Sequence, residues 1–156
     1  MYKAFFPSSN VSEYYQDDKL LFIVKRKRFF FGFRSICDIY KENILIFSFY
    51  SLEFTSLFNN LKILSQKLTE EVFIEKSKNR FFLIVNRHKL HLKFNSNPFD
   101  KKVCKIFKDD NLVGDIERET KNSKIYFNFN FNQDLDLEYY ALILFSMCSV
   151  GITDSI

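Results

Sequence analysis

The sequence predicts a mainly β protein, a closed antiparallel barrel of about ten to twelve strands that encloses one hydrophobic C-terminal α-helix. Three observations support this fold: a two-residue hydrophobic period, polar turns between the periodic runs, and one uncharged run near the C-terminus that breaks the period. The length of 156 residues suits one domain spanning 1–156, with strands over about 2–132. At 47% hydrophobic and 27% charged residues, the chain has enough apolar material to form a core.

The two-residue period is clearest in KIYFNFNFN, residues 124–132. Phe127 and Phe129 fall on one face of a strand and Asn128 and Asn130 on the other, because successive side chains of a strand point to opposite faces. The run FFLIVNRHKLHLKF, residues 81–94, alternates in a similar way, which predicts one face with Phe82, Ile84, Leu90, Leu92 and Phe94. Further strands are expected at 20–25, 29–40 with a break, 44–51, 61–67, 71–76, 102–107 and 112–118.

Polar breaks separate these runs at 41–43, 76–79, 95–98, 109–111 and 121–123. Their spacing predicts a meander of antiparallel strands. The chain contains only 3 Gly and 2 Pro, so Asn and Asp must supply most of the left-handed turn conformations.

A helix is expected over about 136–151, with Asp134 or Asp136 as its N-cap and Gly151 at its end. Residues 139–152 carry no charge, so this helix must be surrounded on all sides. Its uncharged part spans roughly 21 Å, short of the ~30 Å needed to cross a bilayer. Enclosure by the strands is therefore favoured over a transmembrane helix.

The late strand pair KIFKDDNLVGDIERE (105–119), a closing strand and a C-terminal apolar helix together resemble the tubby C-terminal-like superfamily, which includes LURP-one-related and phospholipid-scramblase-like proteins. The run FFFGFRSICDIYKENILIF (29–47) is similar to a strand pair near the front of such domains. The resemblance covers nearly the whole chain and implies a barrel around a central helix. It also implies binding at membranes, since tubby domains bind phosphoinositides. No binding residue carries over, because no motif matches residue by residue.

The residues that usually carry catalysis are sparse, so the sequence predicts no enzyme, no cofactor and no metal site. His88 and His91 lie three apart in a predicted strand and face opposite sides, so they cannot bind one metal together. We expect His88 to be a hydrogen-bonded histidine of the interior or rim. The three cysteines are scattered, which is typical of a reducing compartment and favours a cytoplasmic location. The N-terminal residues lack the apolar region of a secretory signal.

Basic residues supply the positive signal, on a chain with a net charge of +4. Residues 19–34 hold six basic residues and no acid, beside a run of Phe. The candidate ligands for an anionic partner are Lys25, Arg26, Lys27, Arg28 and Arg34, with a second basic row of Arg87, Lys89 and Lys93 around His91. The favoured ligand is an anionic phospholipid surface, with the protein peripheral to the membrane, and this hypothesis is strengthened if the two sets adjoin.

Three alternatives stay open for these basic residues. In the first alternative, the tetrad 25–28 is only a solvated hairpin end and the adjacent Phe residues lie in the core. In the second, it binds nucleic acid, which is less favoured than a phospholipid surface as the anionic partner. The third alternative is a small protein-interaction or inhibitor module that docks through segregated charge, since residues 109–119 carry five acids and one arginine. The sequence does not specify an oligomeric state.

Overall fold

The computed structural model describes residues 1–29, 33–53, 59–77, 80–97, 100–132 and 136–149. One helix, α1 (Glu138–Cys148), follows twelve strands. The strands are β1 (Tyr2–Ser8), β2 (Val11–Gln16), β3 (Lys19–Phe29), β4 (Arg34–Lys41), β5 (Ile44–Glu53), β6 (Asn59–Gln66), β7 (Val72–Ser77), β8 (Arg80–Val85), β9 (His88–Phe94), β10 (Lys102–Lys108), β11 (Asn111–Lys121) and β12 (Lys124–Phe131).

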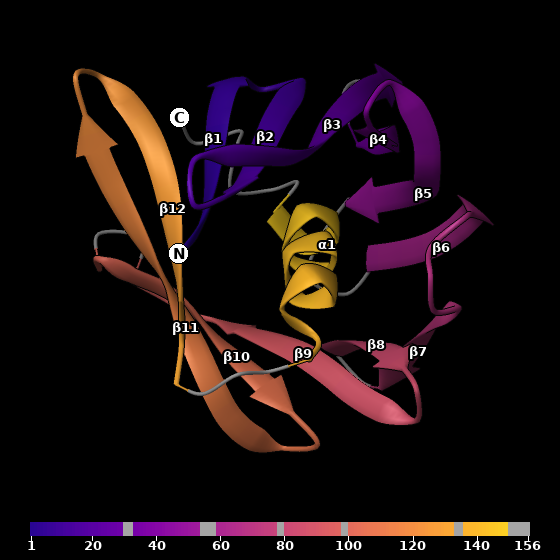
Figure 1. Cartoon of the computed structure of the whole chain (residues 1–156). Coiled ribbons are helices and arrows are strands. Elements are labelled where there is room, and N and C mark those ends of the chain that lie inside the picture. The colour runs from indigo at the N-terminus through magenta and orange to yellow at the C-terminus, as the bar shows by residue number, and fades with distance from the viewer. Residues whose placement is uncertain (30–32, 54–58, 78–79, 98–99, 133–135, 150–156) are drawn as a thin grey trace.

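The strands form a single antiparallel sheet that curls around α1 into a nearly closed barrel (Figure 1). Its order is β6-β5-β4-β3-β2-β1-β12-β11-β10-β9-β8-β7, so the chain forms a meander whose first and last strands pair. The predicted fold class is confirmed.

Side chains bridge the two sheet edges, β6 and β7, where the ladder stops. The Gln66 side-chain amide makes the two hydrogen bonds that the backbone of a neighbouring strand would make. Its Nε2 donates to the Val72 carbonyl at 3.1 Å, and its Oε1 accepts from the Val72 N–H at 2.9 Å. The Tyr140 hydroxyl of α1 accepts from the Glu70 N–H at 3.1 Å. These bonds connect β6 to β7 across the last gap of the barrel and attach the segment between them to α1.

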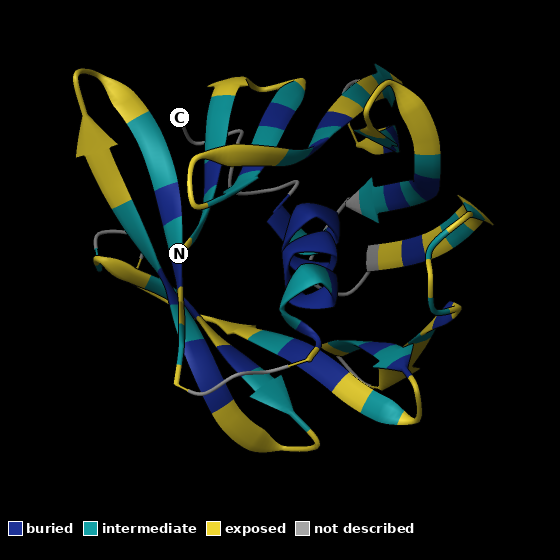
Figure 2. Ribbon diagram, viewed as in Figure 1, coloured by how far each residue is buried: buried dark blue, intermediate teal, exposed yellow. Residues whose placement is uncertain are grey.

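The core lies between the inner faces of the strands and α1, which is buried on nearly all sides (Figure 2). Leu142, Ile143, Leu144 and Phe145 are all at most 1% exposed, as expected for a fully enclosed helix. Phe127 and Phe129 of β12 face this helix, as their alternation predicts.

The helix is shorter than predicted and begins differently. Its N-cap is Leu137, without a side-chain cap, so the expectation that Asp136 caps it is wrong. Leu137 is buried, and its carbonyl accepts from the N–H groups of Tyr140 and Ala141. The helix ends at Cys148, whereas Asp134 and Gly151 lie outside the described residues. Across the described chain, no helix has the length and apolar content to span a membrane.

Five two-residue turns supply all ten positive-φ residues found outside glycine in the described chain. Seven of the ten are Asn or Asp, which confirms their predicted role in the turns. One turn, Asn86–Arg87, falls inside the run 81–94. That run is therefore a hairpin of β8 and β9, which corrects the prediction of one alternating run.

The hairpin also changes which side chains share a face. Leu83 lies opposite Leu90, and both are fully buried against the core. Phe82 lies opposite His91 on the other side of the sheet. The predicted common face of Phe82 and Leu90 is wrong, because a two-residue turn shifts the parity of the second strand relative to the first.

Candidate functional site

The basic tetrad Lys25–Arg28 lies within β3, which continues through it to Phe29. Phe22 and Val24 point into the core, so the same parity directs Arg26 and Arg28 inward and Lys25 and Lys27 outward. Both lysines are exposed, and both arginines are half-buried. The tetrad is thus divided between two faces of the sheet.

Arg26 and Arg28 hold the β1–β2 turn against β3. Arg26 Nη1 and Arg28 Nη2 donate to the Ser9 carbonyl at 3.4 and 3.2 Å. Arg26 also lies beside Cys37, its direct cross-strand neighbour on β4. These contacts give the two arginines a structural role at one end of the barrel.

We define the hairpin surface as the outward residues Lys25, Lys27, Phe29 and Arg34 together with Phe33, which is exposed just before β4 begins. Lys27 Nζ lies 5.4 Å from the centroid of the Phe29 ring, and Arg34 is opposite Phe29 in the ladder. Lys25 Nζ lies 5.1 Å above the ring of Tyr40. The side chains of Phe29 and Phe33 are 40% and 37% exposed. This hairpin therefore combines cations with accessible aromatic rings.

The second basic row lies on the other side of the barrel. Five strands separate β3 from β9 along either direction of the ring. Arg87 sits in the β8–β9 turn with φ of 70°, and Lys89 pairs with Glu75 at 2.9 Å. The two predicted sets of basic residues do not adjoin, so they cannot contact one ligand patch together.

Lys93 is exposed on β9 and lies opposite Lys105 of β10. The two lysines line a hollow of about 330 Å³ together with Lys102. Asp115 binds Lys102 at 2.8 Å, so one carboxylate offsets part of this charge. Lys93 is the member of the second row that borders a concave surface.

The two histidines face different environments, as predicted. His88 is half-exposed at the rim, and its Nδ1 lies 2.6 Å from Asp109 Oδ2. The Lys89 N–H, together with His88, lowers the pKa of the Asp109 carboxyl. His91 is only 3% exposed, because its ring stacks on Phe107 at 4.8 Å and also contacts Phe82. This burial lowers the pKa of His91.

The described residues hold no group of three or more His, Cys, Asp or Glu arranged to bind a metal ion. Cys37 and Cys104 are free and buried, and their burial raises the pKa of both thiols. They are therefore protonated at neutral pH, which disfavours nucleophilic chemistry at these positions.

Two features were missed at the sequence level: the buried His91 stack and an interruption of the β1–β12 ladder beyond Phe5. Pro7, inside a strand, was a usable signal for the interrupted ladder, because proline interrupts strand pairing.

Comparisons of the chain with protein-family models, curated proteins and solved structures find no match.

Proposed function

We propose that this protein is a non-enzymatic binding module that docks on an anionic membrane surface through the hairpin surface. The observation that carries this proposal is the exposure of Phe29 and Phe33 beside Lys27 and Arg34. Cations attract the anionic headgroups, and exposed aromatic rings suit the interface between headgroups and acyl chains. The predicted resemblance to tubby-like domains points in the same direction.

The expected strength follows from the charges. Each Lys or Arg near an anionic leaflet contributes ~1 kcal/mol, so Lys25, Lys27 and Arg34 supply about 3 kcal/mol before screening. This corresponds to roughly a hundredfold preference for anionic over neutral vesicles. Arg26 and Arg28 are left out of this sum, because they contact the Ser9 carbonyl.

Vesicle flotation tests the proposal with phosphatidylcholine alone and with phosphatidylserine added. Wild-type protein should bind only the anionic vesicles, and less so in 1 M salt, where the Debye length falls to ~3 Å. Replacing Lys25, Lys27 and Arg34 by Ser should abolish binding while leaving Tm nearly unchanged, because exposed charges contribute little to folding.

The matched control replaces Arg87, Lys89 and Lys93 by Ser on the opposite side of the barrel, with the same change in net charge. This control should still bind. Equal losses in the two triple variants would mean that total charge, and not the hairpin surface, drives binding. If wild-type protein ignores anionic vesicles at low salt, the membrane proposal fails and protein interaction becomes the leading function.

A further inference from the structure

The β1–β12 ladder stops before either strand ends. Pairing runs from Tyr2 opposite Phe129 to Phe5 opposite Tyr126, although β1 continues to Ser8 and β12 begins at Lys124. Pro7 has no N–H to donate, and the pairing of β1 with β2 shifts register between Phe5 and Ser8. Residues 6–8 and 123–125 therefore face each other without ladder bonds, across what we call the seam notch.

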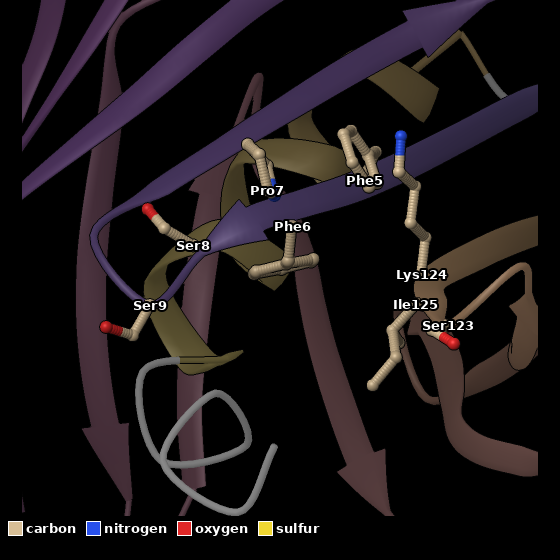
Figure 3. A pocket seen from close by; sticks show the side chains of 8 residues that line it. All are labelled: Phe5, Phe6, Pro7, Ser8, Ser9, Ser123, Lys124 and Ile125. Atoms are coloured by element: carbon tan, nitrogen blue, oxygen red, sulfur yellow. The ribbon is translucent and has the colours of Figure 1, made fainter.

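The seam notch holds a hollow of about 450 Å³. Its walls include Phe5 and Phe6 from β1 and Lys124 and Ile125 from β12. Successive residues of a strand point to opposite faces of the sheet. Because the hollow is lined by both Phe5 and Phe6, and by both Lys124 and Ile125, it lies between β1 and β12 and not on one face of the sheet. Figure 3 shows Phe6 and Ile125 on one side of the sheet and the Lys124 side chain extending on the other, toward Phe5.

The size of the hollow matches a short strand. A strand in a sheet occupies about 4.8 Å laterally, about 10 Å through the sheet and about 3.3 Å per residue, or roughly 160 Å³ per residue. A hollow of about 450 Å³ thus accommodates about three residues of extended chain. Three is also the length of the unpaired stretch on each side, 6–8 and 123–125.

The inner wall of the seam notch is apolar. Phe6 and Ile125 pack on the core, and the Phe6 ring lies 5.1 Å from that of Phe127. Continuing the β1–β12 register places Phe6 opposite Ile125, so a residue inserted between them would also point inward. An apolar side chain fits that position.

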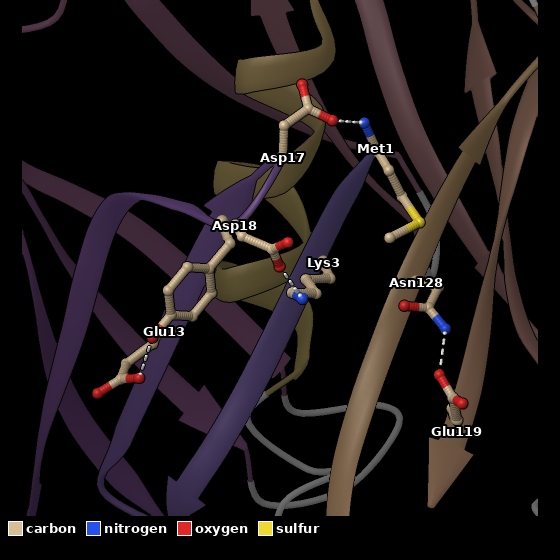
Figure 4. A network of polar contacts seen from close by, with 8 residues as sticks. Met1, Lys3, Glu13, Asp17, Asp18, Glu119 and Asn128 are labelled. Carbon is tan, nitrogen blue, oxygen red and sulfur yellow. Dashed lines mark hydrogen bonds and ion pairs between the residues drawn. The ribbon is translucent and has the colours of Figure 1, made fainter. Parts of the chain in front are cut away.

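The outer wall is cationic. Lys124 Nζ lies 5.6 Å from the centroid of the Phe5 ring, and no carboxylate of the described residues pairs with it. Its cross-strand neighbour is another cation, Lys121. Glu119, the nearby acid on β11, accepts a hydrogen bond from Asn128 at 3.0 Å (Figure 4). An acidic residue inserted opposite Lys124 would relieve this unbalanced charge.

We propose that the seam notch binds a short extended segment of another protein by strand addition. Its backbone pairs with the free edges of β1 and β12, an apolar side chain contacts Phe6 and Ile125, and the next, acidic side chain meets Lys124. Because β1 and β12 are antiparallel, the inserted segment is parallel to one of them and antiparallel to the other. This mode of recognition takes affinity from the main chain and specificity from alternate side chains.

Amide NMR on the intact protein tests the proposal with blocked tripeptides of valine, glutamate and threonine in both sequence directions. Lysine replaces glutamate in the comparison peptides. The glutamate peptides should shift the amide signals of Phe6, Ser8 and residues 123–125 and bind about two- to fivefold more tightly than the lysine peptides. N-methylation of the peptide amides should abolish these shifts.

A charge reversal gives the decisive comparison. Lys124→Glu should reverse the preference and favour the lysine peptides. Lys62→Glu makes the same change in net charge at an exposed position on β6, far from the notch in the strand order, and should keep the wild-type preference. Equal effects of the two variants would overturn the proposal. It is also overturned if no tripeptide shifts these amides at millimolar concentration, or if octanoate shifts them and the peptides do not, in which case the notch holds a small amphipathic molecule.

Discussion

Phe145 of α1 tests how the barrel is stabilised, because its ring contacts three others. The ring centroids of Phe127, Phe129 and Phe94 lie 5.3, 5.2 and 6.4 Å from that of Phe145, which is fully buried. Truncating a buried Phe to Ala costs about 3–5 kcal/mol, and each aromatic pair contributes about 0.5–1.5 kcal/mol beyond area burial. With three pairs lost, Phe145→Ala should fall near the upper end of that range.

Urea denaturation followed by circular dichroism measures this loss, with an unchanged m-value showing that the unfolded surface is the same. A loss of about 5 kcal/mol is a third or more of the 5–15 kcal/mol typical of a domain. Phe73→Ala is the control, since Phe73 is 55% exposed on β7 and should cost less than about 0.5 kcal/mol. Similar losses in the two variants, or a loss below about 1 kcal/mol for Phe145→Ala, would refute a core built around this ring.

Three further variants test the barrel seam, the buried histidine and one glycine. Gln66→Ala leaves the Val72 N–H and carbonyl without their partners and should cost about 1–3 kcal/mol, with faster hydrogen exchange at Val72 and unchanged exchange in β11. Burial holds the pKa of His91 below its unfolded value near 6.5, so stability should be fully present above that pH and fall as pH drops toward the folded-state pKa. His91→Phe should flatten this part of a Tm-versus-pH curve, and an unchanged curve would exclude His91 as the cause. A methyl at Gly114 would overlap the Asn130 carbonyl oxygen, so Gly114→Ala should lower Tm by several degrees, and an unaltered Tm would contradict this close approach of β11 and β12.

The fold was predictable because the signals that define it are local. Alternation in residues 124–132 fixes which side chains face the helix, and the absence of charge in 139–149 requires enclosure. The Asp109–Asp110 and Asn122–Ser123 turns were predicted at the correct places, since their residues tolerate left-handed conformations.

The candidate site was less predictable, because it depends on parity and on strand order. The split of Lys25–Arg28 between two faces follows only once β3 is known to be continuous. The separation of Lys27 from Lys93 depends on the order of all twelve strands. The turn at Asn86–Arg87 contains neither Gly nor Pro, so the run around it resembled one strand, and its faces were assigned wrongly.

The position of α1 in the chain order has a consequence for synthesis on the ribosome. All twelve strands emerge before the helix that fills their interior, and at about 5–20 residues per second the helix follows the first strand by about 7–30 s. During that time the inward faces of residues such as Phe47 and Leu83 have no helix to cover them. The nascent chain thus exposes apolar strand surface, which chaperones bind, until Cys148 has left the exit tunnel. The emergence of the last turns of α1 therefore determines when the protein can be released from those chaperones.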